Sequence, residues 1–239
     1  MNDLNKTART VGALFLISNA TFLIGAMVIL EPILNAQDYL LQVSANSTQV
    51  ILGALLELIN GVAYIGIAVL MFPILRQRFE SMALGYVALR IIEFVTQLAA
   101  SLVPLILVTL SEDFLSAGGP VNQAVGELLL ATRYWSFETL TLVFSLSALM
   151  FYYMLYQTRL IPRFLSLWGL IGSALVLTNA LFEIFGVDLG AGVGLATGLP
   201  MLLNELFLGV WLIVKGFSPD AIIYDPAEAV DSQGQLRTS

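Results

Sequence analysis

Six apolar stretches, each long enough to cross a membrane as a helix, constrain this chain more than any other feature. They cover residues 11–30, 50–72, 82–110, 134–156, 164–185 and 199–217. A helix of about 20 residues crosses a hydrocarbon core of ~30 Å, whereas the strands of a membrane barrel alternate in polarity over about ten residues. The continuous runs therefore predict an all-α integral membrane protein, built as a six-transmembrane-helix bundle.

Composition supports this class and excludes several others. Hydrophobic residues make up 58% of the chain and charged residues 11%, whereas a soluble domain has about 25% charged residues. The net charge of −7 opposes binding of nucleic acid, which needs a basic surface. The chain has no Cys and no His, so zinc, iron–sulfur and haem sites lack their usual ligands, and no cofactor is expected.

Lysine and arginine are concentrated in alternate connections between the apolar stretches. On one side lie Lys6, Arg9, Arg76, Arg78, Arg159, Arg163, Lys215 and Arg237. The remaining connections are acidic. The positive-inside rule then places both termini in the cytoplasm. We expect one transmembrane domain over residues 1–217, a flexible cytoplasmic tail over 218–239, and a multi-pass location in the plasma membrane.

Ionisable and amide side chains interrupt the apolar runs, and each is a candidate for function. A charge at the centre of a transmembrane helix costs roughly 2.5–3.5 kcal/mol on insertion scales, so such residues face the bundle interior. The candidates are Glu57, Asn60, Arg90, Glu93, Glu138, Glu183, Asn204 and Glu205. Counting along the stretches puts Glu57, Glu138, Glu183 and Glu205 in the outer half of the membrane, with Arg90 and Glu93 near mid-depth. We expect these side chains to line one polar cavity.

Carboxylates outnumber cations in this set, since five Glu face only Arg90 and Arg133. Either some Glu are protonated, or a cation completes the site. Oxygen ligands would suit Mg²⁺, Ca²⁺ or Mn²⁺, and the sequence does not identify a metal. Arg90 is expected to pair with Glu93 on its own helix, or with Glu57 or Glu138 across the bundle.

Two stretches carry a family resemblance: TRLIPRFLSLWGLIG (158–172) and LNELFLGVWLIVKGF (203–217). They resemble the domain of unknown function 4386 family of multi-spanning membrane proteins, over nearly the whole chain before the tail. The resemblance implies an integral membrane protein of bacterial type. It supplies no reaction, substrate or catalytic residue.

Three functions remain open from the sequence. A Glu-rich cavity would bind a small solute, a cation or a proton, as in a transporter or sensor. Polar faces that only hold helices together would indicate a structural or regulatory subunit of unknown oligomeric state. A pair of Glu with Arg90 holding a phosphate would suit an intramembrane lipid-modifying enzyme, although no catalytic motif favours an enzyme. A hollow between the Glu side chains would favour solute binding, and tight ion pairs would favour the structural role. An opening toward the outer leaflet would favour the lipid-modifying enzyme.

Overall fold

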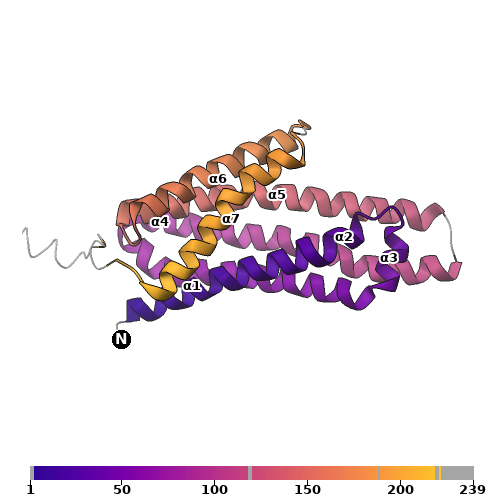
Figure 1. Cartoon of the computed structure of the whole chain (residues 1–239), viewed down its shortest axis with the longest axis horizontal. Coiled ribbons are helices and arrows are strands. Elements are labelled where there is room, and N and C mark those ends of the chain that lie inside the picture. Colours follow the sequence, from indigo (N-terminus) through magenta and orange to yellow (C-terminus); the bar gives the residue numbers. More distant parts are fainter. Residues whose placement is uncertain (1–2, 118–119, 188, 219–220, 222–239) are drawn as a thin grey trace, which may run out of the picture.

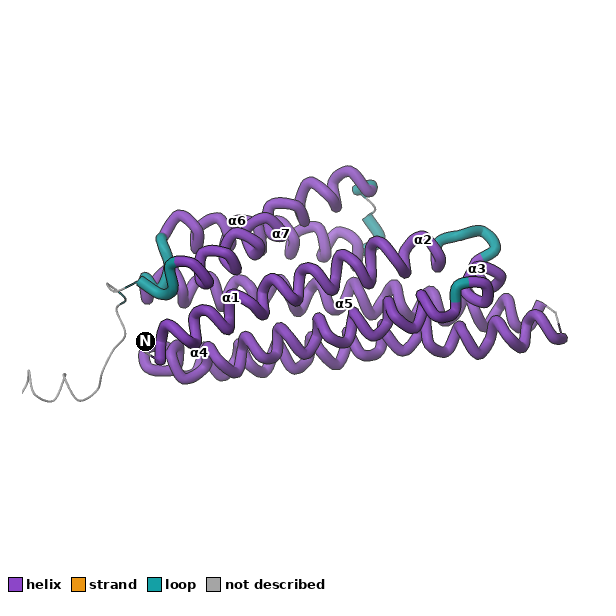
Figure 2. Tube along the Cα trace, turned by 60° about the horizontal axis from the view of Figure 1, so that its bottom comes forward, coloured by secondary structure: helices purple, strands orange, loops and turns teal. Residues whose placement is uncertain are grey.

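The structure is a computed structural model that describes residues 3–117, 120–187, 189–218 and 221. Within these ranges the elements are helical and no strand occurs, as the sequence predicts. In chain order they are α1 (Asp3–Phe22), the π-helix η1 (Leu23–Leu30), α2 (Glu31–Leu34), α3 (Tyr39–Ala45), α4 (Ser47–Ala117), α5 (Pro120–Thr158), α6 (Arg163–Ile184) and α7 (Ala191–Val214). The long helices run roughly along one axis, with loops at their ends (Figures 1 and 2). Of the expected tail over 218–239, all but Ser218 and Ala221 lies outside the described residues.

Helix α4 is a helical hairpin. Its backbone leaves the helical region at Phe79 (φ −134°, ψ 61°). The Ser101 hydroxyl donates to Glu57, and Gly61 packs directly against the ring of Phe94. Such contacts require the arm before Phe79 to lie antiparallel to the arm after it. The chain therefore crosses the bundle twice within α4.

Five helical segments are long and apolar enough to cross a membrane, and α4 counts as one of them. Because α4 folds back at Phe79, the bundle has six crossings, as predicted. The start of α1, the turn of α4, the α5–α6 turn and the end of α7 lie at one end of the molecule (Figure 1). Seven of the ten lysines and arginines lie at this end, which the positive-inside rule assigns to the cytoplasm.

Helices of unequal length make the opposite end protrude. Helix α5 has 39 residues and α6 has 22, which at ~1.5 Å per residue corresponds to about 58 Å and about 33 Å. The ends of α4 and α5 therefore continue well past the outer end of α6 (Figure 1). A second apolar core fills this outer part. It is formed by residues of η1, α2, α3 and α4, such as Leu30, Val43 and Leu107, and residues of α5 pack against it. Tyr39 is buried there and donates to the Gln123 carbonyl (3.2 Å). Burial raises the pKa of its hydroxyl, which favours the donating form.

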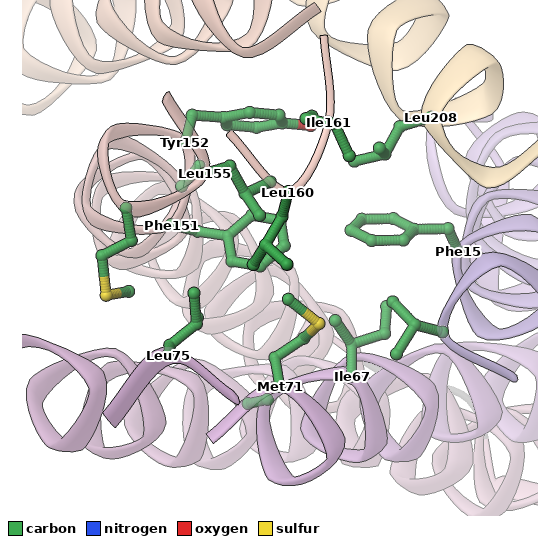
Figure 3. Packing of buried hydrophobic residues seen from close by; sticks show 14 of the residues in the cluster. Phe15, Ile67, Met71, Leu75, Phe151, Tyr152, Leu155, Leu160, Ile161 and Leu208 are labelled. Carbon is green, nitrogen blue, oxygen red and sulfur yellow. The ribbon is translucent and has the colours of Figure 1, made fainter. Parts of the chain in front are cut away.

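The main core lies nearer the cytoplasmic end and joins α1, α4, α5, α6 and α7. Phe151 of α5 lies near its centre (Figure 3). Its ring stacks on Tyr86 at 5.1 Å and lies 6.1 Å from the ring of Phe15. Ile67 and Met71 of α4 fill the space below it (Figure 3). Dispersion contacts of this density hold helices together in lipid, where the hydrophobic effect between helices is absent.

Close helix approaches occur at glycines. A Cβ on Gly12 of α1 would lie 2.5 Å from the Gly209 carbonyl oxygen of α7, and one on Gly25 would lie 2.9 Å from that of Gly53 in α4. Gly25 belongs to η1, whose end bonds Glu31 N–H to the Ala26 carbonyl, five residues back. This wider turn comes just before Pro32, whose ring would clash with the preceding turn of a regular α-helix.

Helix α7 begins earlier than the sequence indicated. The last apolar stretch in the sequence begins at residue 199, which predicts a helix starting there. Instead α7 starts at Ala191 and contains Pro200 in its interior. Backbone groups at membrane depth must bond within the helix, and this requirement outweighs the weak helix propensity of glycine.

The glycine contacts predict opposite effects of alanine in α1 and α7. Gly12→Ala should destabilise the protein by about 1–3 kcal/mol, because backbone has to move. Gly198→Ala is the matched control: nothing lies within 4 Å of its Cβ position, and helix propensity favours alanine by up to about 1 kcal/mol. Thermal unfolding in one detergent should show a lower Tm for Gly12→Ala and an equal or higher one for Gly198→Ala. Equal losses would contradict the α1–α7 crossing.

The orientation can be checked with single cysteines, because the natural chain has none. Asp38, Glu112 and Arg78 are exposed. Cysteine at Asp38 or Glu112 should react with an impermeant thiol reagent in intact cells, and cysteine at Arg78 only after the cells are opened. Labelling of the Arg78 position in intact cells would reverse the assigned orientation.

Candidate functional site

Glu57 forms a buried ion pair with Arg133, which joins the first arm of α4 to α5. The carboxylate is fully buried and accepts both ends of the guanidinium, at 2.5 and 3.1 Å. Ser101 of the second α4 arm also donates to it (2.9 Å), and Arg133 donates to the Ala100 carbonyl (2.8 Å). The guanidinium lies 4.7 Å from the centre of the Phe137 ring. This bidentate pair satisfies both oxygens of Glu57 and ties three helical segments together.

Arg90 pairs with Glu93 one turn away, the first of the partners expected from the sequence. Its guanidinium donates to both carboxylate oxygens, at 2.9 and 3.1 Å, and both side chains are buried. Ser147 of α5 donates to Glu93 (3.3 Å). The rings of Tyr64, Tyr86 and Phe144 lie 5.4–5.5 Å from the guanidinium carbon. These aromatic faces stabilise the cation where water cannot.

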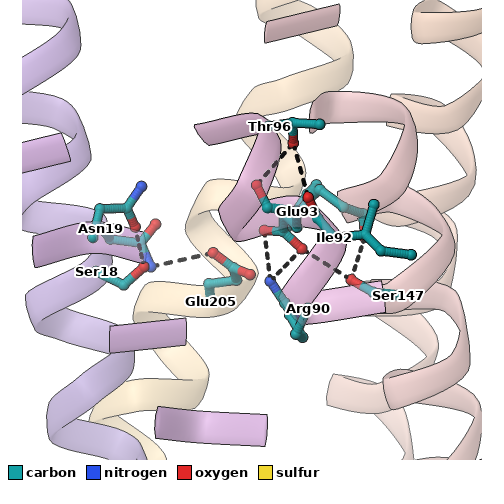
Figure 4. A network of polar contacts seen from close by, with 10 residues as sticks. Ser18, Asn19, Arg90, Ile92, Glu93, Thr96, Ser147 and Glu205 are labelled. Atoms are coloured by element: carbon teal, nitrogen blue, oxygen red, sulfur yellow. Dashed lines mark hydrogen bonds and ion pairs between the residues drawn. The ribbon is translucent and has the colours of Figure 1, made fainter. Parts of the chain in front are cut away.

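Glu205 of α7 lies between this pair and α1, as Figure 4 shows. Asn19 donates to its Oε2 at 3.2 Å, and a second bond to the Phe15 carbonyl (2.9 Å) holds the Asn19 amide in place. Glu205 is half-buried. Among the described residues it has no ion-pair partner within bonding distance. Its second oxygen, Oε1, is therefore available to a proton or a ligand.

Several buried polar atoms around Arg90 and Glu205 lack hydrogen-bond partners in the described part of the protein. They are the hydroxyls of Tyr64, Tyr86 and Tyr152 and the Nε of Arg90, although the Tyr86 hydroxyl lies beside the Arg90 guanidinium. The charge of Glu205 acts electrostatically on Arg90, Tyr86 and Tyr152, which places the groups in one neighbourhood. Buried hydroxyls in proteins almost always have a partner, and an orphan calls for water or a bound molecule. We name Asn19, Tyr64, Tyr86, Arg90, Glu93, Tyr152 and Glu205 the central polar cluster.

Depth separates the central polar cluster from the Glu57–Arg133 pair. At ~1.5 Å per residue, Arg90 and Glu205 lie about 15 Å from the cytoplasmic ends of their helices, and Glu57 about 33 Å from the turn at Phe79. Glu205 was expected in the outer half of the membrane. It lies near mid-depth instead, because α7 begins at Ala191 and positions Glu205 well inside the helix.

The other expected residues lie apart from the cluster. Glu138 and Glu183 approach each other between α5 and α6, where their charges repel, and Tyr134 donates to Glu183 (3.3 Å). Asn60 accepts from Ser18 (2.5 Å), and Asn204 donates to the Leu165 carbonyl (3.0 Å). The two amides thus hold helices together. The eight candidates are therefore divided among several places rather than gathered in one cavity.

Sequence reasoning left out the tyrosines of the cluster and Asn19. Tyr64 could have been identified from the sequence, because it shares a helix face with Glu57 and Asn60. Tyr86 lies four residues before Arg90, so the same helical spacing could have found it. Arg133 was recognised as a cation, but it precedes the apolar stretch 134–156, which concealed its pairing with Glu57.

The carboxylates that the structure describes are too dispersed for a metal site of several ligands. No group of three or more Asp or Glu side chains in the described ranges is arranged to hold a metal ion. Glu57 and Glu93 are already neutralised by arginines. The central polar cluster instead offers one uncommitted carboxylate oxygen and three hydroxyls, a set that suits a proton or a small polar solute.

The two ion pairs predict a specific pattern of rescue. Removing one member of a buried pair strands the other and destabilises by roughly 3–5 kcal/mol. Arg133→Leu should therefore lower the Tm strongly, and adding Glu57→Leu should recover part of the loss, whereas adding Glu93→Leu should not. Arg90→Leu should be rescued by Glu93→Leu and not by Glu57→Leu. Thermal unfolding of the four double variants checks the assignment, and rescue across the pairs would contradict it.

Comparison with known proteins identifies the family but no activity. A family model described as a domain of unknown function (DUF4386) matches residues 10–216. No curated protein and no solved structure matches the chain. The match covers both ion pairs, the central polar cluster and all six membrane crossings, so the chain belongs to the DUF4386 family of domains of unknown function.

Proposed function

We propose that this membrane protein binds a proton or a small polar or cationic solute at the central polar cluster, as a transporter or sensor does. The observation that carries the proposal is that Glu205 has no ion-pair partner among the described residues and lies close to buried hydroxyls without a partner there. An unsatisfied buried hydroxyl or carboxylate oxygen costs roughly 1–3 kcal/mol, and binding a proton, water or solute recovers this loss. Solute sites of membrane transporters also lie near the bilayer midplane.

Each member of the cluster has a distinct role in this proposal. Glu205 Oε1 is the binding atom, and Asn19 orients the carboxylate through Oε2. The Tyr152 hydroxyl is the hydrogen-bonding group for the bound species, since it is buried and has no hydrogen-bond partner among the described residues. The Tyr86 hydroxyl lies beside Arg90 and links that cation to the site. Arg90 stays neutralised by Glu93 and tunes the field at Glu205.

A structural role is the second candidate, and one observation favours it. Glu57 and Glu93 are both committed to arginines, so two of the five carboxylates serve to hold helices. A lipid-modifying enzyme has less support. A groove between α4 and α5 faces outward at Thr96, Trp135 and Thr139, but its lining residues include no ionisable side chain and thus no acid–base pair.

Reaction with a lipophilic carbodiimide tests the proposal, because the reagent adds to protonated carboxyl groups in apolar surroundings. In purified protein, mass spectrometry should find the adduct on Glu205 and not on Glu57 or Glu93, whose oxygens are held by arginines. The yield at Glu205 should fall as the pH rises and the carboxyl loses its proton.

Function then requires a second measurement on the same protein. When the outside of proteoliposomes is made acidic, a pH-sensitive dye inside should report faster acidification of the lumen with the natural protein than with Glu205→Gln. Glu127→Gln, which removes an exposed acid from the outer end of α5, is the matched control and should behave like the natural protein. An unreactive Glu205 together with equal fluxes in all three proteins would favour the structural role.

A further inference from the structure

Three cations surround one groove at the cytoplasmic end of α6 and α7. The groove has a volume of about 570 Å³ and is formed by the α5–α6 turn and the end of α7. Arg159, Arg163 and Lys215 line it, and all three are exposed. No Asp or Glu is among its lining residues. A volume of this size is typical of small-molecule sites.

The positive charge of the groove is not neutralised by the described protein. None of the three cations forms an ion pair with a described residue. Arg163 lies 5.1 Å from the ring of Tyr156, which fixes its position without reducing its charge. The first turn of α6 adds to the positive potential, because Pro162 caps it without a side-chain hydrogen bond and the N–H groups of that turn carry partial positive charge.

Two constrained turns, joined by a hydrogen bond, form the walls of the groove. Arg159 has a left-handed backbone (φ 53°), rare for a residue with a side chain, and Gly216 has φ 73°. The Ser218 N–H donates to the Leu160 carbonyl (2.8 Å), which fastens the chain after α7 to the α5–α6 turn. Such a tied pair of turns holds the cations around one space.

The remaining lining is apolar and aromatic, at the level where lipid headgroups meet acyl chains. Trp211 lies one helical turn from Lys215 toward the membrane, and Ile161 and Phe217 line the groove as well. Tryptophan prefers the membrane interface. A ligand with a phosphate at its polar end and acyl chains at the other would satisfy the cations and the apolar wall together.

We infer that this groove binds the phosphate of an anionic phospholipid of the cytoplasmic leaflet. An arginine guanidinium donates two parallel hydrogen bonds to phosphate oxygens, and Lys215 adds a third positive charge to those of Arg159 and Arg163. The site is separate from the central polar cluster, and it stands whether or not that cluster binds a solute.

Native mass spectrometry of the full chain tests the inference. Protein is reconstituted with equal parts phosphatidylcholine and phosphatidylglycerol, or with phosphatidylcholine alone, and then released into detergent. The natural protein should retain one phosphatidylglycerol in preference to phosphatidylcholine. Each cation near a membrane surface contributes about fivefold to the binding of an anionic lipid, so Arg159→Gln with Arg163→Gln and Lys215→Gln should lower the affinity roughly a hundredfold.

A control of equal charge separates the groove from general attraction to the membrane. Arg9→Gln with Arg76→Gln and Arg78→Gln also removes three exposed cations from the cytoplasmic end, but none lines the groove, and retention should be unchanged. Lys215→Gln alone should cost about fivefold, which provides a readout if the triple variant does not fold.

Three results would overturn the inference. One is equal retention by the two triple variants. The second is displacement of the lipid by millimolar inorganic phosphate, which would assign the groove to a soluble phosphate compound. The third is retention only after the acids at 220, 225, 228 and 231 are neutralised, which would make the chain's own C-terminal segment the occupant.

Discussion

Glu57 and Arg133 meet where water is excluded, and neither side chain could be there without the other. An isolated buried charge would cost several kcal/mol, whereas the bidentate pair satisfies both groups. The pair also requires one register between α4 and α5, and the bond from Ser101 extends that requirement to the second arm of α4. The hairpin turn at Phe79 follows from it, because residues 57 and 101 are equally distant from residue 79. One electrostatic requirement thus sets the relative positions of three of the six crossings.

The Arg90–Glu93 pair meets the same requirement within α4, and only the Ser147 hydroxyl of α5 links it to a second helix. Both residues lie on α4 three residues apart, so their attraction is satisfied whatever α1 or α7 does. Cohesion at this depth comes instead from the stacked rings of Tyr86 and Phe151 and from the glycine crossing of α1 and α7. Packing contacts are short-ranged, and α7 packs against α1 and α6 rather than being held by an ion pair. An ion pair therefore fixes the helices of the outer half of the bundle, and packing contacts hold those of the inner half.

The sequence predicted the features that hydropathy and charge control directly. Six crossings followed from apolar length, and the Arg90–Glu93 pair followed from helical spacing. Pairing across helices was harder to predict, because Glu57 had several equally spaced candidates and only the packing of α4 on α5 brings Arg133 to it. The start of α7 was missed for a different reason. Gly192, Gly194 and Gly198 signal a turn in water, but in lipid the need for internal hydrogen bonds makes the same residues helical. Because α7 starts earlier than expected, Glu205 lies near mid-depth rather than in the outer half.

Helix α7 carries the two features that the described structure leaves electrostatically incomplete. Glu205 lacks a counter-ion, and Lys215, ten residues later, lines a groove of unpaired cations. Ten residues of helix span about 15 Å, so the two sites are joined by a rigid rod and any axial shift of α7 moves both. A lipid phosphate held by Arg159 and Arg163 would anchor Lys215 to the α5–α6 turn, and thereby fix the depth of Glu205 relative to Asn19. Because the Asn19–Glu205 bond is 3.2 Å long and is the described hydrogen bond of that carboxylate, a shift of one ångström along α7 is enough to break it and free both oxygens. The proposed lipid site and the proposed solute site would then be coupled through the position of one helix, with no need for a rearrangement of the α4–α5 half.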